Sequence, residues 1–142
     1  MPPHADRVQA CLDDLIAFAA REDVPPVVKA TIFHAQFETV HPFTDGNGRT
    51  GRTLLHRMLA ADEVLLHTML PVSAGLLHNV ERYMDALNAY HDGAFEPMIE
   101  CLTDALELAV VIGSRIASDV DDILARWASA NTDRTGSASH RL

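Results

Sequence analysis

Apolar residues recur every three or four positions along most of the chain, and the strict alternation typical of a half-buried strand is almost absent. The first such stretch runs from about Ala5 to Arg21 and has the pattern of an amphipathic helix. A second helix should follow Pro25-Pro26, because proline is tolerated in the first turn of a helix, and should run to about Glu38. The beginning of the chain is therefore predicted to be helical.

Three later stretches also have helical periodicity, and the expected ranges are about Gly48 to Ala61, Ser73 to Tyr90, and Glu96 to Ala130. Residues 92–93, Asp-Gly, mark the end of the second, since glycine commonly terminates helices. The third is longer than a typical globular helix, and Gly-Ser at 113–114 offers a point for a kink or break. The connector 62–71 contains the apolar run 64–66, which also suits a short strand.

These elements predict an all-α fold in one domain, which is the usual outcome for a chain of 142 residues. We expect the catalytic or binding core to span residues 1–130, with the motif loop between two core helices. Residues 131–142 are rich in Ser, Thr and Gly, and a disordered tail is expected there.

The composition is that of a globular protein, with 48% hydrophobic and 22% charged residues. A net charge of −9 argues against nucleic acid and anionic membranes as general partners, because both attract positive surfaces. No apolar run has the length of a membrane span, and the N-terminus does not resemble a signal peptide. Cys11 and Cys101 are far apart in helix-like surroundings, so two buried thiols in a reducing, cytoplasmic setting are expected.

The candidate chemistry is concentrated in residues 41–52, which read His-Pro-Phe-Thr-Asp-Gly-Asn-Gly-Arg-Thr-Gly-Arg. They supply an imidazole, a carboxylate, a glycine-rich turn and two guanidinium groups. If a helix begins at Gly48, its free N–H groups and its dipole face an anion in the loop. Arg49 and Arg52 are three apart, so they share a helix face and can bind phosphate oxygens bidentately. The segment thus has the groups needed to hold a nucleoside triphosphate and activate a nucleophile.

Residues 46–51 also match the dinucleotide pattern G-x-G-x-x-G. That pattern has meaning after a buried strand, with an acidic residue about twenty positions later. Here a loop sequence precedes the glycines, and residues 65–68 are Leu-Leu-His-Thr. The sequence does not fit a kinase glycine loop, because no lysine on a downstream strand follows. It does not fit a Walker motif, because no Gly-Lys-Ser/Thr follows the glycines.

The string at 41–52 resembles the signature of Fic-domain proteins, H-P-F-x-[D/E]-G-N-[G/K]-R-x-x-R, at every fixed position. The approach at 34–40 and the segment 82–93 also resemble this family, and the resemblance covers about residues 3–106. It implies an all-α fold and transfer of AMP from ATP, with Mg²⁺, to a Ser, Thr or Tyr hydroxyl of a target protein.

Carried over from the resemblance, His41 is the general base, a role that suits an imidazole because it titrates near neutrality. Asp45 is implied to bind Mg²⁺ together with phosphate oxygens. Asn47 is implied to position the α-phosphate, and Phe43 to point inward and anchor the loop.

The remaining implied contacts are with the nucleotide. The region of Gly46 and Gly48 forms the anion hole, and Arg49 and Arg52 hold the outer phosphates and the departing pyrophosphate. Glycine rather than lysine at position 48 favours nucleotidyl over phosphoryl transfer within this resemblance. Tyr83 suits packing with a wet hydroxyl, and stacking on adenine is its alternative role.

Three departures from the family pattern bear on function. Members usually have a β-hairpin flap before the first helix here, and no such segment precedes Met1-Pro2-Pro3 in this sequence. The inhibitory pattern [S/T]-x-x-x-E-[G/N] is matched only in part, by residues 103–108, so any inhibition is expected from a separate antitoxin-like protein or from an absent segment. Met84 and His91 stand where some members place Tyr and Asn near adenine, which leaves the donor base open.

Two alternatives to protein adenylylation follow. One is a nucleotide-binding, toxin-like module with little transfer activity in the absence of a partner. The other is a transferase that uses another nucleotide or a CDP-linked donor. His34, His41 and His56 do not form an i, i+4 zinc pair. His56 is four residues after Arg52, so it could face the pocket, but a surface role is expected. Trp127 is expected to pack at the end of the long helix or in a homodimer contact.

Overall fold

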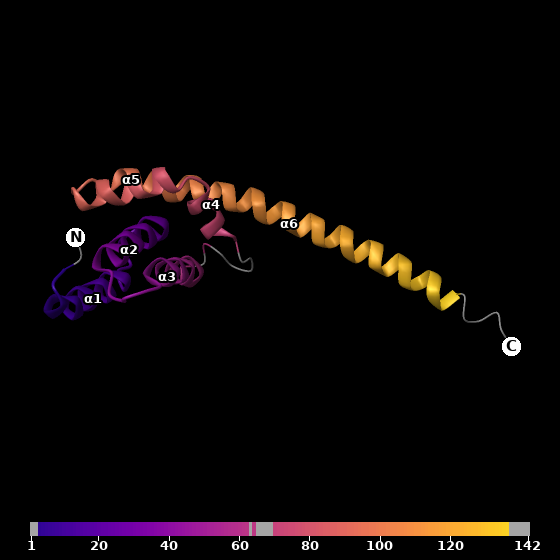
Figure 1. The fold of residues 1–142 in the computed structure, drawn as a ribbon, viewed down its shortest axis with the longest axis horizontal. Helices are drawn as coiled ribbons and strands as arrows, with labels where there is room; N and C mark the ends of the chain where they lie inside the picture. Colours follow the sequence, from indigo (N-terminus) through magenta and orange to yellow (C-terminus); the bar gives the residue numbers. More distant parts are fainter. Residues whose placement is uncertain (1–2, 63, 65–69, 137–142) are drawn as a thin grey trace.

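The computed structural model describes residues 3–62, 64 and 70–136, with side chains up to residue 131. These residues form six α-helices and no strand, which confirms the all-α prediction (Figure 1). The helices are α1 (Ala5–Ala19), α2 (Pro26–Val40), α3 (Asn47–Ala61), α4 (Val72–His78), α5 (Val80–His91) and α6 (Glu96–Gly136). Within this described part, no helix combines the length and the apolar character needed to cross a membrane.

The first three helices form one side of the globular part. In Figure 1, α1, α2 and α3 lie below α5 and the first half of α6. Helix α2 contacts α1, α3, α5 and α6, so it is the central element. The motif loop connects α2 to α3, as predicted, and its geometry is therefore set by the most enclosed helix of the fold.

The prediction of a single helix over residues 73–90 is wrong. The structure has two helices, α4 and α5, which are separated at Asn79, where the backbone leaves the helical region (φ −132°, ψ 84°). The side-chain Oδ1 of Asn79 accepts a hydrogen bond from the N–H of Arg82 at 3.0 Å. Asparagine thus caps the start of α5, a position for which it is strongly preferred. The end of α5 agrees with the prediction, because Gly93 follows it with φ +93°.

Helix α6 is continuous, so the break that 113–114 offered does not occur. A single glycine weakens a helix by only about 1 kcal/mol, and regular structure on both sides overcomes that cost. The helix continues to Gly136, beyond the boundary expected at 130. The rest of the expected tail, 137–142, lies outside the described residues, as does most of the run 64–66 that also suited a strand.

The main hydrophobic core lies where α2 to α6 meet. Its most enclosed side chains are Leu55, Leu59, Leu76, Met98 and Leu102, each at most 2% exposed. A smaller cluster of Leu15, Phe33 and Phe37 joins α1 to α2. Of the two free thiols, Cys101 is buried as expected, whereas Cys11 is only partly buried.

An ion pair holds the two ends of the α2–α3 pair together. Lys29 is 7% exposed, and its Nζ lies 2.9 Å from Oδ2 of Asp62, just after α3. The same Nζ donates a hydrogen bond to the backbone oxygen of Arg21, in the connection between α1 and α2, at 3.1 Å. Removal of one partner would leave a buried charge uncompensated, so this contact ties the end of α3 to the start of α2.

Candidate functional site

The motif histidine has an unusual backbone. His41 follows the last residue of α2 in the left-handed region (φ 49°, ψ 57°), and its N–H donates to the oxygen of Phe37 at 3.0 Å. Among the residues that the structure describes, His41 is the only non-glycine residue with positive φ. Such conformations are costly for a residue with a Cβ and are concentrated at functional sites. The turn places the imidazole on the exposed side of the loop.

Asn47 fastens the loop from within. Its side chain is 2% exposed; Oδ1 accepts from the N–H of Phe43 at 2.9 Å, and Nδ2 donates to the oxygen of Phe43 at 2.6 Å. Both ends of the amide therefore bind one residue of the loop. The resemblance implied that Asn47 positions the α-phosphate. In this structure the same side chain also holds the loop in place.

Phe43 differs from the expected inward anchor. Its ring remains 49% exposed, and its aromatic neighbour is Phe37, at 6.2 Å between ring centroids. The backbone of Phe43, held by Asn47, is the part that anchors the loop. The exposed half of the ring stays available to a ligand or a target segment.

Helix α3 begins at Asn47, one residue before the expected start, and Gly46 precedes it with φ +83°. The oxygen of Gly46 accepts the first helical hydrogen bond, from the N–H of Thr50 at 2.9 Å. A residue with a Cβ is strained at this φ, so glycine is the suitable residue for the turn. The start of a helix, with its free N–H groups, is a type of position suited to an anion.

The carboxylate of Asp45 lies at the surface beside Arg49. Its Oδ2 is 3.1 Å from Nη2 of Arg49, and the two side chains are 89% and 77% exposed. An exposed pair of this kind adds little stability, so both groups remain available to a ligand. The described residues contain no cluster of three potential metal-ligating side chains. A divalent cation here would need phosphate oxygens in addition to Asp45, which is the usual situation for Mg²⁺.

The two arginines line one cavity, as their spacing predicted. A cavity of about 320 Å³ is bordered by Arg49, Arg52, Thr53, His56 and Ser73. His56 borders this cavity one turn after Arg52, which is the pocket-facing alternative to the surface role expected for it. That i, i+4 spacing was visible in the sequence. Ser73 was missed, because it belongs to a separate helix whose position the sequence does not reveal.

Glu38 lies behind the loop, at the last turn of α2. Its Oε1 is buried and has no hydrogen-bond partner among the described residues. Burial raises the pKa of Glu38, and the positive charge of Arg52 and the nearby His41 act in the opposite direction. The guanidinium of Arg52 also lies close to Gly48, where an added Cβ would be 3.1 Å from Nη1. Glu38 therefore places a partly buried carboxyl close to Arg52, which is expected to bind phosphate, and to His41, the expected base.

Tyr83 does not reach the cavity, and the expectation of a wet hydroxyl is wrong. The residue is 6% exposed, and its hydroxyl lies 2.9 Å from Nε2 of His34, which is fully buried. Burial raises the pKa of Tyr83 and lowers that of His34 to about 4, so both are neutral at pH 7. The pair joins α5 to α2 below the motif and leaves adenine stacking without this side chain.

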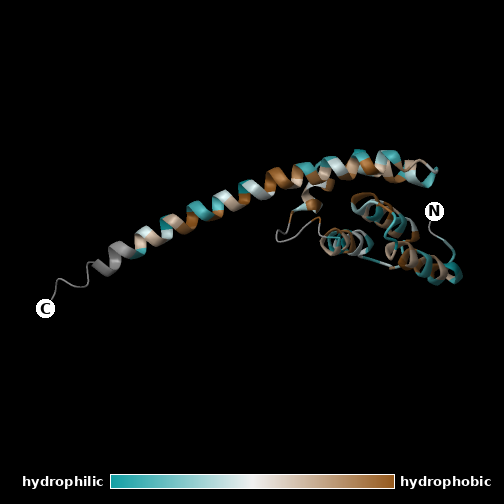
Figure 2. Ribbon diagram, turned by 180° about the vertical axis from the view of Figure 1, so that it is seen from behind, coloured by the Kyte–Doolittle hydropathy of each residue, from teal (hydrophilic) through white to brown (hydrophobic). Residues whose placement is uncertain are grey.

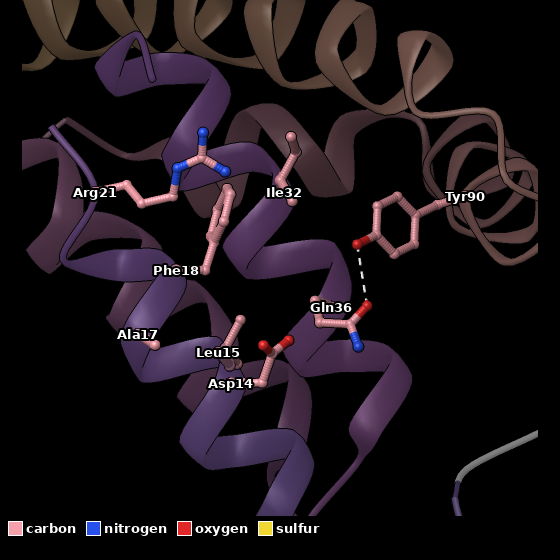
Figure 3. Close-up of a pocket in the computed structure, with 8 residues that line it drawn as sticks. All are labelled: Asp14, Leu15, Ala17, Phe18, Arg21, Ile32, Gln36 and Tyr90. Atoms are coloured by element: carbon pink, nitrogen blue, oxygen red, sulfur yellow. Dashed lines mark hydrogen bonds between the residues drawn. The ribbon is translucent and has the colours of Figure 1, made fainter. Parts of the chain in front are cut away.

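A larger cavity, of about 420 Å³, lies between α1, α2 and α5 (Figure 3). It is formed by α1, α2 and Tyr90 of α5, and the hydroxyl of Tyr90 donates to Oε1 of Gln36 at 3.0 Å. None of its lining residues belongs to the motif. The smaller cavity is the candidate functional site, because only it brings the motif arginines together.

Comparison with known proteins places this geometry in a family. Residues 1–59 match the sequence model of the Fic/DOC family. A probable protein adenylyltransferase from Aquifex aeolicus is 37% identical over 98 residues, which cover 66% of this chain and 27% of that protein. The protein adenylyltransferase Fic from Aedes aegypti is 32% identical over 82 residues, 58% of this chain and 15% of that protein.

A solved structure agrees with the sequence comparisons. The crystal structure of a Fic family protein from Desulfovibrio desulfuricans superposes with a TM-score of 0.70 and 33% identity, over 85% of this chain and 36% of that one. This chain thus spans about a quarter of the Aquifex relative and about a third of the Desulfovibrio protein. On the complete 41–52 motif, the helical fold and these relatives, the chain belongs to the Fic/DOC family.

Proposed function

We propose that this protein is a protein adenylyltransferase, which transfers AMP from ATP to a Ser, Thr or Tyr hydroxyl of a target protein. The observation that carries the proposal is the loop itself: it holds His41 in a strained turn, is fastened by Asn47, and leads into the helix whose Arg49 and Arg52 line one cavity. The names of the curated relatives, protein adenylyltransferases, support the same reaction class.

In this proposal His41 takes the proton from the target hydroxyl as the oxygen attacks the α-phosphorus of ATP. The bond from the α-phosphorus to the oxygen bridging to the β-phosphate breaks, and pyrophosphate leaves. Arg49 and Arg52 neutralise the charge that develops on the leaving group, and the first N–H groups of α3 face the phosphates. Because His41 is exposed, a hydroxyl side chain of the target protein can reach it from solvent.

Mg²⁺ is the cation that this site would use, and Asp45 would hold it. The exposed carboxylate and the absence of further ligands among the described residues suit an ion that takes most of its ligands from phosphate and water. When bound with ATP, the ion reduces the negative charge that repels an attacking oxygen. Asp45 would exchange its contact with Arg49 for the cation, which releases the guanidinium for phosphate.

The buried position of Tyr83 favours a second candidate, a transferase with a different nucleotide donor. The two arginines expected to bind phosphate line the cavity, whereas Tyr83, for which adenine stacking was the alternative role, is turned into the core. Unlabelled GTP, CTP and UTP added in excess would suppress labelling from ATP if the donor base is not recognised. Suppression by ATP alone would support adenylylation.

The experiment for the proposed function is incubation of the protein with Mg²⁺ and α-labelled ATP in a cytosolic extract. His41→Ala is the test variant, and His78→Ala, an exposed histidine at the end of α4, is the matched control. Covalent label that is lost in His41→Ala and kept in His78→Ala supports the proposal. Label that is independent of His41 contradicts it.

Nucleotide binding without transfer would point to the toxin-like module, which needs a partner. Co-purification of a small helical partner would support this case. The 103–108 segment lies within α6 with Glu107 exposed, so an inhibitor of the site would be a separate, antitoxin-like protein. Equilibrium dialysis with labelled ATP separates this case from a protein that does not bind nucleotide at all. A cytoplasmic site of action fits the requirement for ATP and belongs to the proposal.

A further inference from the structure

The second half of α6 extends away from the globular part and has an uncovered apolar stripe (Figures 1 and 2). The stripe consists of Ile116, Val120, Ile123 and Trp127, which are 52%, 46%, 53% and 71% exposed. Aliphatic and aromatic side chains of this size are rarely left in water in a row along one helix. We therefore expect another protein surface to cover this stripe.

The spacing of the stripe is that of a coiled-coil seam. The four residues follow one another at intervals of four, three and four positions, which is the a and d pattern of a heptad repeat. The same helix face is buried earlier in α6, where Met98, Leu102, Ala105 and Ala109 pack into the core. Between the two parts, Gly113 faces Leu70 and Pro71 of the same chain. The seam thus passes from an occupied part to an open part that begins at Ile116.

The residues beside the stripe differ on its two sides. With Val120 and Trp127 as a positions, the g positions are Asp119 and Arg126, which carry opposite charges. The e positions on the other side are Ala117 and Leu124, and Leu124 is 56% exposed. In coiled coils the e and g positions decide partner and orientation. On one flank, charge therefore decides which helix can pair with the stripe. On the other flank, side-chain size decides it.

We propose that the open part of α6 pairs with the same part of a second copy of this chain, in antiparallel orientation. With the two-fold axis between residues 121 and 122, Val120 faces Ile123 of the second copy and Ile116 faces Trp127. The g positions then meet across the interface, so that Asp119 of each copy lies beside Arg126 of the other. On the opposite flank, the small Ala117 accommodates Leu124.

A parallel pair lacks this complementarity. In that orientation g positions face e positions, and Asp119 would lie beside Leu124 of the second copy. Two globular parts with a net charge of −9 per chain would also lie at the same end and repel each other. The antiparallel pair places them at opposite ends, and because α6 points away from α1 to α3, both motif loops remain open (Figure 1).

The oligomeric state of the full 142-residue chain tests the proposal, by sedimentation equilibrium over a range of concentrations. Trp127 is the single tryptophan and provides a second readout, since its emission should shift to the red as a dimer dissociates on dilution. Ile123→Glu should weaken dimerisation by about tenfold or more, because it places a charge in the seam. Ala125→Glu, on the polar face of the same helix, should leave it unchanged.

Charge reversal tests the orientation. Asp119→Arg alone places like charges together at two sites in the dimer and should weaken it by about tenfold, and Arg126→Asp alone should do the same. The double variant Asp119→Arg/Arg126→Asp should return the dissociation constant to within about threefold of the original value. A chain that stays monomeric at every concentration overturns the proposal. A dimer that survives Ile123→Glu, or that ignores the single charge reversals, also overturns it.

Discussion

The buried histidine beneath the motif gives this protein a defined acid sensitivity. His34 is fully buried, its Nε2 bonds the hydroxyl of Tyr83, and its Nδ1 has no hydrogen-bond partner among the described residues. Burial lowers the pKa of His34 from 6.5 to about 4, and the charge of Arg52 acts in the same direction. The folded protein therefore resists protonation of this ring, whereas the unfolded chain accepts the proton near pH 6.5.

The size of the effect follows from linkage. Between pH 6.5 and about 4 the unfolded chain binds a proton at this position that the folded protein does not, so stability falls as the pH falls through this window. At about 1.4 kcal/mol for each pKa unit, the full loss is about 3 kcal/mol. Above pH 6.5 the ring is neutral in both states and has no influence on the pH dependence. The loss is large beside a total stability of about 5 to 15 kcal/mol.

Denaturant unfolding of wild type and His34→Gln at pH 7 and pH 4 measures this loss. Glutamine keeps a polar group near Tyr83 and does not titrate, so the difference between the two proteins isolates His34. Glu38, whose pKa is raised by burial, gains stability as the pH falls, but it is present in both proteins and cancels. Wild type should lose about 3 kcal/mol more than the variant. Parallel stability profiles, within about 1 kcal/mol, would refute the reasoning.

Two further predictions concern packing and the loop. Gly75→Ala should destabilise the fold by about 2–4 kcal/mol, because its Cβ would lie 2.1 Å from the backbone oxygen of Ala105. Gly113→Ala, whose Cβ meets only side-chain ends, should be neutral or stabilising by up to about 1 kcal/mol, and equal unfolding free energies for the two variants would contradict this. Asn47→Ala should increase amide hydrogen exchange at Phe43, and unchanged protection there would show that the side chain does not hold the loop.

Periodicity predicted most of the helices because each has one apolar face, which is a local property. It failed at Asn79, where apolar residues continue at helical spacing across the boundary between α4 and α5. The signal was nevertheless present, since asparagine is a preferred N-cap and Glu81 follows in the first turn. The hydrophobic periodicity was given more weight than the N-cap residue, which contributes about 1 kcal/mol to helix stability.

The motif residues are neighbours in the chain, so a shared loop and a shared arginine face were predictable from spacing alone. The groups behind the loop were not. The His34–Tyr83 contact joins residues 49 positions apart, and the Lys29–Asp62 contact joins residues 33 positions apart. Such pairs depend on the register between helices, which no local pattern contains. For this reason the sequence left adenine stacking open as an alternative for Tyr83, whose side chain belongs to the core.

The misleading G-x-G-x-x-G match has a physical explanation in this structure. Gly46 supplies the positive φ at the turn, and Gly48 lies under the guanidinium of Arg52. Gly51 allows α3 to approach α2, since a Cβ there would lie 2.3 Å from Oε1 of Glu38 and 3.2 Å from Nδ1 of His34. In dinucleotide-binding folds the same three letters also serve a turn, a close approach to phosphate and helix packing. Here the three glycines serve a turn, a close contact with a guanidinium and helix packing, needs that arise in unrelated folds. The spacing of the glycines therefore does not identify the surrounding architecture.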